Sequence, residues 1–226
     1  MGSIHDNLQA VRQRIERAAR AAGRGAQSVT LLAVSKTHPA SLVEQAMAAG
    51  QAAFGENYVQ EAIEKMDALP KAEWHMIGPL QSNKTRLVAA RFDWVHAVES
   101  EKIARRLSGQ RSGKLPPLNV LIQVNVSGEA SKSGAAAAQV AGLAQAIARM
   151  PRLKLRGLMA IPEPGASPER YAELNALYEK LKAEFRFDTL SVGMSDDLET
   201  AIAQGSTMVR IGTAIFGARQ SVRPAA

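Results

Sequence analysis

The sequence predicts a closed (β/α)8 barrel of the TIM type, extended by one additional N-terminal helix. Short apolar or β-branched segments alternate with longer segments of helical period, and the 226 residues contain eight strand candidates. Regular βα alternation predicts a parallel sheet, and eight such units are typical of a closed barrel. An open, doubly wound sheet is the alternative. We expect one domain that spans residues 1–226.

The predicted strands are short and rich in β-branched and apolar residues. They cover residues 29–35, 52–56, 73–78, 93–98, 117–126, 153–161, 189–195 and 207–212.

The predicted helices are rich in Ala, Glu, Lys, Gln and Leu, and several begin or end at Pro, Asp or Gly. The clearest cover residues 41–49, 58–69, 135–150 and 169–185, with a short helix after Asp196 and Asp197.

An extra helix over residues 4–22 precedes the first strand, with an apolar stripe that includes Leu8, Val11 and Ile15. Residues 213–226 are too few and too irregular for a full final helix. We therefore expect the N-terminal helix to cover the barrel where the eighth helix of the repeat would lie.

The composition excludes several classes of protein. Hydrophobic residues make up 46% and no apolar stretch approaches 18 residues, so we expect no membrane span. The net charge of +7 is scattered over helical faces and aromatic residues are only 4%, which argues against nucleic-acid binding. Cysteine is absent, which agrees with a cytoplasmic location. We expect a monomer without a metal site.

The strand ends contain the residues that indicate chemistry, because barrels of this kind bind ligands at the C-terminal ends of their strands. The stretch TLLAVSKTHP runs through the first strand to Lys36, a residue type that is seldom buried without a partner. The seventh strand ends in Gly-Met-Ser at 193–195 and the eighth in Gly212 and Thr213. Small residues, hydroxyl groups and backbone N–H groups at these two ends favour phosphate binding.

Arg210 lies between Val209 and Ile211 in the eighth strand, so its side chain points opposite to theirs and needs an acceptor or anionic partner. A lysine amine at a desolvated barrel mouth can attack a carbonyl to form a Schiff base. Pyridoxal 5′-phosphate (PLP) carries an aldehyde and a phosphate, and proteins that bind it place an acid or an arginine beside the ring nitrogen. PLP is therefore a molecule that would fit both the lysine and the predicted phosphate site.

Several of these residues also have purely structural interpretations. Lys36 could mark only the exit of a strand into water, and His75 could be a hydrogen-bonded core histidine. Asn57 and Ser195 could cap the helices that follow them, and Gly212 could serve turn geometry.

Six stretches of the chain resemble one protein family nearly from end to end. They are AVSKTHP (33–39), FGENYVQE (54–61), WHMIGPLQSNK (74–84), GLMAI (157–161), SVGMSDDLETAI (191–202) and VRIGTAIFG (209–217). In this order and spacing they resemble the YggS/PROSC family of pyridoxal phosphate homeostasis proteins. The fold of that family is similar to the barrel domain of alanine racemase, a PLP fold of type III, with one PLP per chain.

The resemblance implies cofactor contacts at seven positions. Lys36 would carry the PLP aldimine and Arg210 would face the pyridine nitrogen. The phosphate would be held by Ser195, Gly212 and Thr213, with Asn57 and His75 flanking the cofactor. The loop at 125–134 resembles a family loop beside the site, where Glu129 and Lys132 would matter for PLP release or delivery.

Three functions are compatible with these residues. The family resemblance implies a carrier that stores, buffers or delivers PLP without turnover, with PLP-dependent apo-enzymes as candidate recipients. The alternative is a PLP-dependent amino-acid racemase, but racemising fold relatives take a second acid-base group from a separate β domain of the partner subunit. We see no such domain here and expect no racemisation above background. A barrel aldolase or isomerase that uses Lys36 on a sugar phosphate is the third function.

Overall fold

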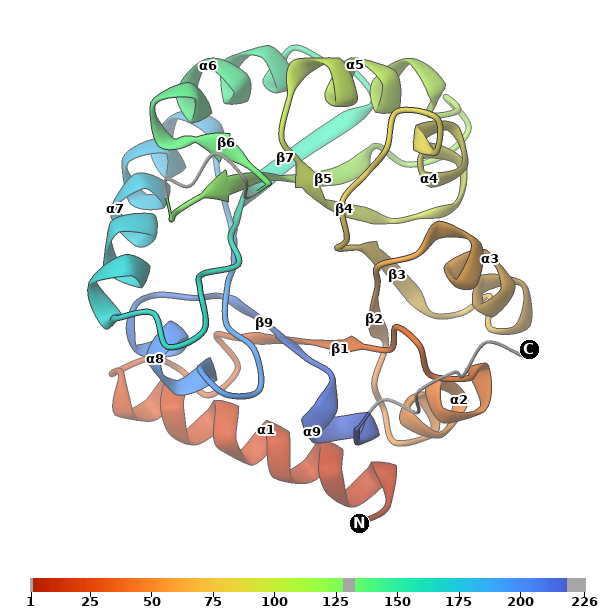
Figure 1. Ribbon diagram of the computed structural model, residues 1–226, viewed down its shortest axis with the longest axis vertical. Helices are drawn as coiled ribbons and strands as arrows, with labels where there is room; N and C mark the ends of the chain where they lie inside the picture. The colour runs from red at the N-terminus through yellow and green to blue at the C-terminus, as the bar shows by residue number, and fades with distance from the viewer. Residues whose placement is uncertain (1, 128–132, 219–226) are drawn as a thin grey trace, which may run out of the picture.

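The strands of the computed structural model, which describes residues 2–127 and 133–218, form a closed parallel barrel (Figure 1). Their bounds are β1 (Thr30–Val34), β2 (Ala53–Glu56), β3 (Glu73–Met76), β4 (Trp94–Val98), β5 (Leu118–Asn125), β6 (Ala135–Ala136), β7 (Leu153–Met159), β8 (Thr189–Ser191) and β9 (Met208–Ile211).

The described helices lie outside this ring of strands (Figure 1). Their bounds are α1 (Ile4–Ala21), α2 (Ala40–Ala48), α3 (Val59–Ala68), α4 (Thr85–Arg91), α5 (Glu101–Gln110), α6 (Ala137–Ala148), α7 (Pro168–Phe185), α8 (Leu198–Ala203) and α9 (Thr213–Phe216). Within the described ranges, no helix is long and apolar enough to cross a membrane.

Closure of the barrel confirms the predicted fold class. The parallel ladder runs from β1 through β2, β3 and β4 to β5, and continues through β7, β8 and β9 back to β1. The pairing of β9 with β1 aligns Arg210 with Leu32, so the last strand of the ring lies directly beside the first. An open sheet would leave these two strands unpaired.

Strand alternation divides the buried side chains into an outer core beneath the helices and a filling inside the barrel. The outer core is a single large apolar cluster. Two smaller apolar clusters lie apart from it, one of them formed by Leu32, Val34, Ala53, Ile77 and Met208. The other consists of Trp94, Ala97, Leu121 and Met159.

Helix α1 covers the barrel beside α8 and α9, as the apolar stripe predicts (Figure 1). Leu8, Val11 and Ile15 are buried on its inner face. Arg14 forms an ion pair with Glu199 and donates from Nη2 to the carbonyl oxygen of Ser195 at 3.1 Å. The first helix therefore also supports the loop that follows β8.

The structure differs from the sequence prediction at two kinds of helix start. Residues 135 and 136 do not begin α6 but pair with the end of β5 as the short strand β6. Neither Asn57 nor Ser195 is an N-cap, because α3 begins after Tyr58 and α8 begins after Asp197. The side chains of Asn57 and Ser195 therefore do not cap these helices.

Candidate functional site

A pocket of about 290 Å³ opens at the C-terminal ends of the strands, on the side of the barrel formed by β1, β2, β8 and β9. It brings together six of the seven residues that the sequence singled out. These are Lys36, Asn57, Ser195, Arg210, Gly212 and Thr213.

Lys36 enters this pocket from the turn that follows β1. Thr37, the next residue, has a φ of 64°, a left-handed conformation that costs free energy in a β-branched residue. Its backbone N–H donates to Glu61 Oε1 at 2.6 Å, and His38 N–H donates to the Ser35 carbonyl at 3.1 Å. These bonds hold the turn that directs Lys36 to the pocket.

A buried cluster centred on Lys65 supports the same turn from behind. The Nζ of Lys65 donates to Glu56 Oε1, to Glu61 Oε1 and to the Ser35 carbonyl oxygen, each at 2.7 Å. Ser35 Oγ also donates to Glu56 Oε1 at 2.6 Å. Three acceptors match the three N–H donors of an ammonium group. Burial raises the pKa of Glu56, and the charge of Lys65 opposes that shift.

Arg210 is a buried cation at the pocket, with only 4% of its surface exposed. Nη1 donates to the Ser191 carbonyl at 2.7 Å and to Ser191 Oγ at 2.8 Å, and Nη2 donates to the Ala160 carbonyl at 2.8 Å. These neutral oxygens account for three of its five N–H donors. Burial lowers the pKa of Arg210 to about 10, so the group stays charged at neutral pH.

The loops after β8 and β9 form the other wall of the pocket. Gly193 has a φ of 103°, and a Cβ at this position would lie 2.6 Å from the Cβ of Ala201 on α8. Only glycine allows this approach, which places Ser195 in the pocket wall. Gly212 precedes α9, which begins at Thr213, so the first N–H groups of that helix have no intrahelical partner.

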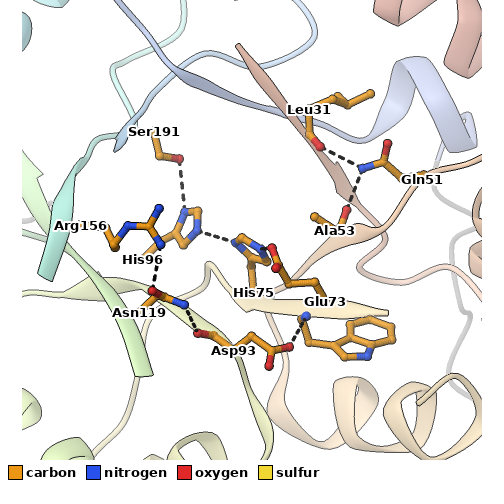
Figure 2. Close-up of polar contacts among 11 residues, drawn as sticks. Leu31, Gln51, Ala53, Glu73, His75, Asp93, His96, Asn119, Arg156 and Ser191 are labelled. Atoms are coloured by element: carbon orange, nitrogen blue, oxygen red, sulfur yellow. Dashed lines mark hydrogen bonds and ion pairs between the residues drawn. The ribbon is translucent and has the colours of Figure 1, made fainter. Parts of the chain in front are cut away.

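His75 does not line this pocket. It is fully buried inside the barrel and lies between Glu73 and His96 (Figure 2). Its Nε2 is 2.7 Å from Glu73 Oε1 and its Nδ1 is 2.9 Å from His96 Nε2. Of the two interpretations that the sequence leaves open, the structure therefore favours the hydrogen-bonded core histidine.

Sequence reasoning missed Lys65 and His96. Lys65 follows Glu61 by four residues on α3, which is the spacing of a helical ion pair, but that spacing does not reveal burial. His75 pairs with Trp94 in the sheet, and His96 lies two residues after Trp94 on the same strand. Because residues two apart on a strand share one face, this spacing was the signal that His96 points into the barrel.

Glu129 and Lys132 lie outside the described residues. The described end of their loop reaches a second cavity of about 340 Å³, where Ser133 is part of the wall. This cavity shares Asn57, Ile77 and Ile161 with the first pocket. The end of the loop therefore lies beside the candidate site.

Comparison with known proteins places this geometry in a family. The sequence profile of the alanine racemase N-terminal domain matches residues 7–220. The chain is 55% identical over 229 residues to the pyridoxal phosphate homeostasis protein of Escherichia coli K12, covering 97% of this chain and 98% of that protein. The chain belongs to the family of pyridoxal phosphate homeostasis proteins. A family member from Pseudomonas aeruginosa is 56% identical over 232 residues, with full coverage of both chains.

Solved structures agree with this family and with the fold. PipY of Synechococcus elongatus, solved without PLP and with PLP bound, has TM-scores of 0.84 and 0.82. Each match is 34% identical and covers 95% of this chain and 100% of PipY. Alanine racemase from Corynebacterium glutamicum has a TM-score of 0.67 at 18% identity, over 97% of this chain and 63% of the racemase. That likeness concerns the fold alone.

Proposed function

We propose that this protein binds PLP in the pocket at the barrel mouth and acts in PLP homeostasis, by storage, buffering or delivery, without catalytic turnover. The observation that carries the proposal is the meeting of Lys36 with Arg210 and the loops of Ser195 and Gly212 in one pocket. The names of the family members and the PLP-bound structure of PipY support it.

The residues of the pocket fit this cofactor. The two N–H donors of Arg210 that have no partner among the described residues suit a ring nitrogen that accepts a hydrogen bond. Ser195, Gly212 and Thr213 offer hydroxyl and backbone N–H donors to a phosphate, and Asn57 also lines the pocket. PLP supplies an aldehyde that a lysine amine captures reversibly, and Lys36 is the pocket's lysine.

Arg210 also bears on the chemistry that the site can support. An acidic partner can keep the pyridine nitrogen of PLP protonated, which strengthens the ring as an electron sink. A guanidinium group only donates, and at a pKa of about 10 it remains charged at neutral pH. This side chain would therefore hold the ring in place with its nitrogen unprotonated, which makes the ring a weaker electron sink than an acidic partner gives.

The experiment is a PLP titration followed by covalent trapping. The purified protein is titrated with PLP, its visible absorbance is recorded, and borohydride reduction is followed by peptide mapping. We expect a yellow protein with the pyridoxyl group on Lys36, and no such adduct in Lys36→Ala. A colourless protein that takes up no PLP would overturn the proposal. Robust turnover of a single amino acid that requires Lys36 would overturn the carrier role.

The proposal extends to a cytoplasmic monomer whose partners are PLP and PLP-dependent apo-enzymes. The exposed large apolar side chains of the described chain include Ile161 and Met194, and both line the pocket. Apolar side chains at the mouth suit contact with a recipient during transfer. Light scattering tests the monomer. Transfer of PLP to an apo-enzyme across a dialysis membrane, compared with transfer in one compartment, tests whether contact is needed.

A further inference from the structure

A continuous line of hydrogen bonds crosses the barrel interior from the pocket to the opposite end. Arg210 Nη1 donates to Ser191 Oγ at 2.8 Å, and Ser191 Oγ lies 3.2 Å from His96 Nδ1. His96 Nε2 lies 2.9 Å from His75 Nδ1, and His75 Nε2 lies 2.7 Å from Glu73 Oε1. Figure 2 shows the part of this line from Ser191 to Glu73.

The two ends of this line reach different faces of the molecule. Arg210 lines the pocket at the C-terminal ends of the strands. Glu73 is the first residue of β3, at the N-terminal end of the barrel, and its side chain is 49% exposed. The three residues between them, His75, His96 and Ser191, are completely buried.

The charges at both ends set the direction in which protons are donated. A guanidinium group can only donate and an ionised carboxylate can only accept. The hydrogen bond from His75 lowers the pKa of Glu73, so this carboxyl group is ionised at neutral pH. Burial lowers the pKa of His75 and holds that of His96 well below its usual range, so both imidazoles are neutral. A neutral imidazole has one N–H and one acceptor nitrogen.

One arrangement of protons satisfies all four contacts. His75 must carry its proton on Nε2 to donate to Glu73, which makes its Nδ1 an acceptor. His96 then donates from Nε2 to His75 and accepts at Nδ1 from the Ser191 hydroxyl. The lone pairs of Ser191 Oγ are thereby left to accept from Arg210.

We propose that Glu73, His75 and His96 are positioning residues for Arg210, acting through a single hydrogen-bond direction that runs from the pocket to the far end of the barrel. This inference rests on the proposed function, because Arg210 matters to PLP only if PLP binds beside it. The carboxylate selects the tautomer of His75, His75 selects that of His96, and His96 turns the Ser191 hydroxyl away from Arg210.

We call the hydrogen-bonded line from Glu73 through His75, His96 and Ser191 to Arg210 the relay. Packing supports it, because the ring of His75 cannot turn freely. His75 stacks on Trp94 with centroids 5.1 Å apart and an angle of 7° between the rings. The guanidinium of Arg156 lies over the ring of Trp94, 4.5 Å from its centroid. Arg156 itself is held by Asp188 and Asn119. A ring fixed in this stack presents its two nitrogens only to Glu73 and His96.

The first test reads the tautomers directly in the protein without PLP. The chain has four histidines, so a long-range 1H–15N correlation spectrum is simple to assign. We expect Nδ1 of both His75 and His96 to resonate as unprotonated nitrogens and Nε2 as protonated ones. A proton on Nδ1 of either ring, or an imidazolium at neutral pH, overturns the proposed direction. This result does not depend on PLP binding.

The second test removes the terminal acceptor. Glu73→Ala should abolish the single tautomer of His75 and weaken PLP binding about three- to tenfold, the range expected for one lost hydrogen bond. Glu73→Gln keeps an oxygen acceptor and should restore the tautomer. Glu44→Ala, at an exposed position on α2, is the matched control. Wild-type tautomers and PLP affinity in Glu73→Ala overturn the relay.

Ser191→Ala tests the link nearest the pocket, with the buried Ser108→Ala on α5 as its control. We expect a similar loss of PLP affinity in Ser191→Ala, with adduct formation on Lys36 retained. Unchanged affinity contradicts the relay and leaves the proposed function standing. Wild-type protein that binds no PLP contradicts the proposed function, and the tautomer spectra then still decide the hydrogen-bond direction.

Discussion

The ammonium nitrogen of Lys65 lies 2.7 Å from Glu56 Oε1 and 2.7 Å from the carbonyl oxygen of Ser35, the residue before Lys36. A lysine on helix α3 thus holds both the end of β2 and the turn that presents the pocket lysine. Removal of the cation would leave the buried carboxylate of Glu56 without its countercharge.

Lys65→Met should therefore destabilise the fold strongly. Breaking a buried ion pair by removing one partner costs about 3–5 kcal/mol, since the other charge remains buried. Urea denaturation measures the change in the free energy of unfolding. Lys180→Met, an exposed position on α7, is the control and should change it little. Equal stabilities of the two variants would show that the cluster contributes nothing.

Gly193→Ala should destabilise the protein and weaken PLP binding. The positive φ is strained for alanine, and the new Cβ would meet Ala201 at 2.6 Å, which displaces the loop that holds Ser195. Gly142→Ala is a matched comparison, because Gly142 lies inside α6 with open space around it. It should gain about 1 kcal/mol through helix propensity. Thermal denaturation and PLP titration of both variants separate the two effects, and a Gly193→Ala protein as stable as Gly142→Ala would refute this account.

Arg210→Lys should weaken PLP binding about tenfold or more, because an ammonium group cannot reproduce the planar set of donors that contacts Ser191 and Ala160. The pyridoxyl adduct on Lys36 should still form at high PLP concentration. Titration by visible absorbance measures the affinity, and the exposed Arg20→Lys on α1 controls for the substitution. Undiminished affinity in Arg210→Lys would argue against its contact with the ring.

Stability should fall as the pH decreases below about 6.5. The pKa of His75 and that of His96 are lowered in the folded protein, so the unfolded chain binds protons in a range where the folded chain does not. Their contribution is complete above the usual histidine pKa near 6.5 and declines below it, by up to about 1.4 kcal/mol per pH unit for each ring.

Urea denaturation at pH 7.5, 6.5 and 5.5 measures this dependence. His96→Gln should reduce the slope by up to one proton, whereas Gln13→Ala, at an exposed position on α1 with a side chain that does not titrate, should leave it unchanged. A free energy of unfolding that is constant from pH 7.5 to 5.5 would contradict neutral, buried histidines.

The strand ends show how far sequence reasoning could reach. Lys36, Ser195 and Gly212 could be grouped because each lies at the C-terminal end of a predicted strand, and parallel strands of a barrel bring these ends to one face. His75 was assigned to the cofactor by resemblance alone, and the structure places it inside the barrel, apart from the residues that line the pocket. A short motif conveys the order of its residues but not their depth along the barrel axis.

The short strand β6 and the Lys65 cluster could not be predicted from the sequence for a related reason. Ala135 and Ala136 have strong helix propensity, but pairing with Val124 and Asn125 overrides it. Lys65 is typical of an exposed helical residue, and only the packing of α3 against β2 turns its amine inward.

The sequence by itself determined the barrel, its eight strands, the covering N-terminal helix and the residues at the strand ends. Those features follow from hydrophobic period and chain order, which are local properties. Only the tertiary structure decided that Lys65 supports the Lys36 turn and that Glu73 connects through two histidines to Arg210. Such contacts depend on strand register and on depth inside the barrel, because a hydrogen bond forms only when its two atoms lie within about 3 Å of each other.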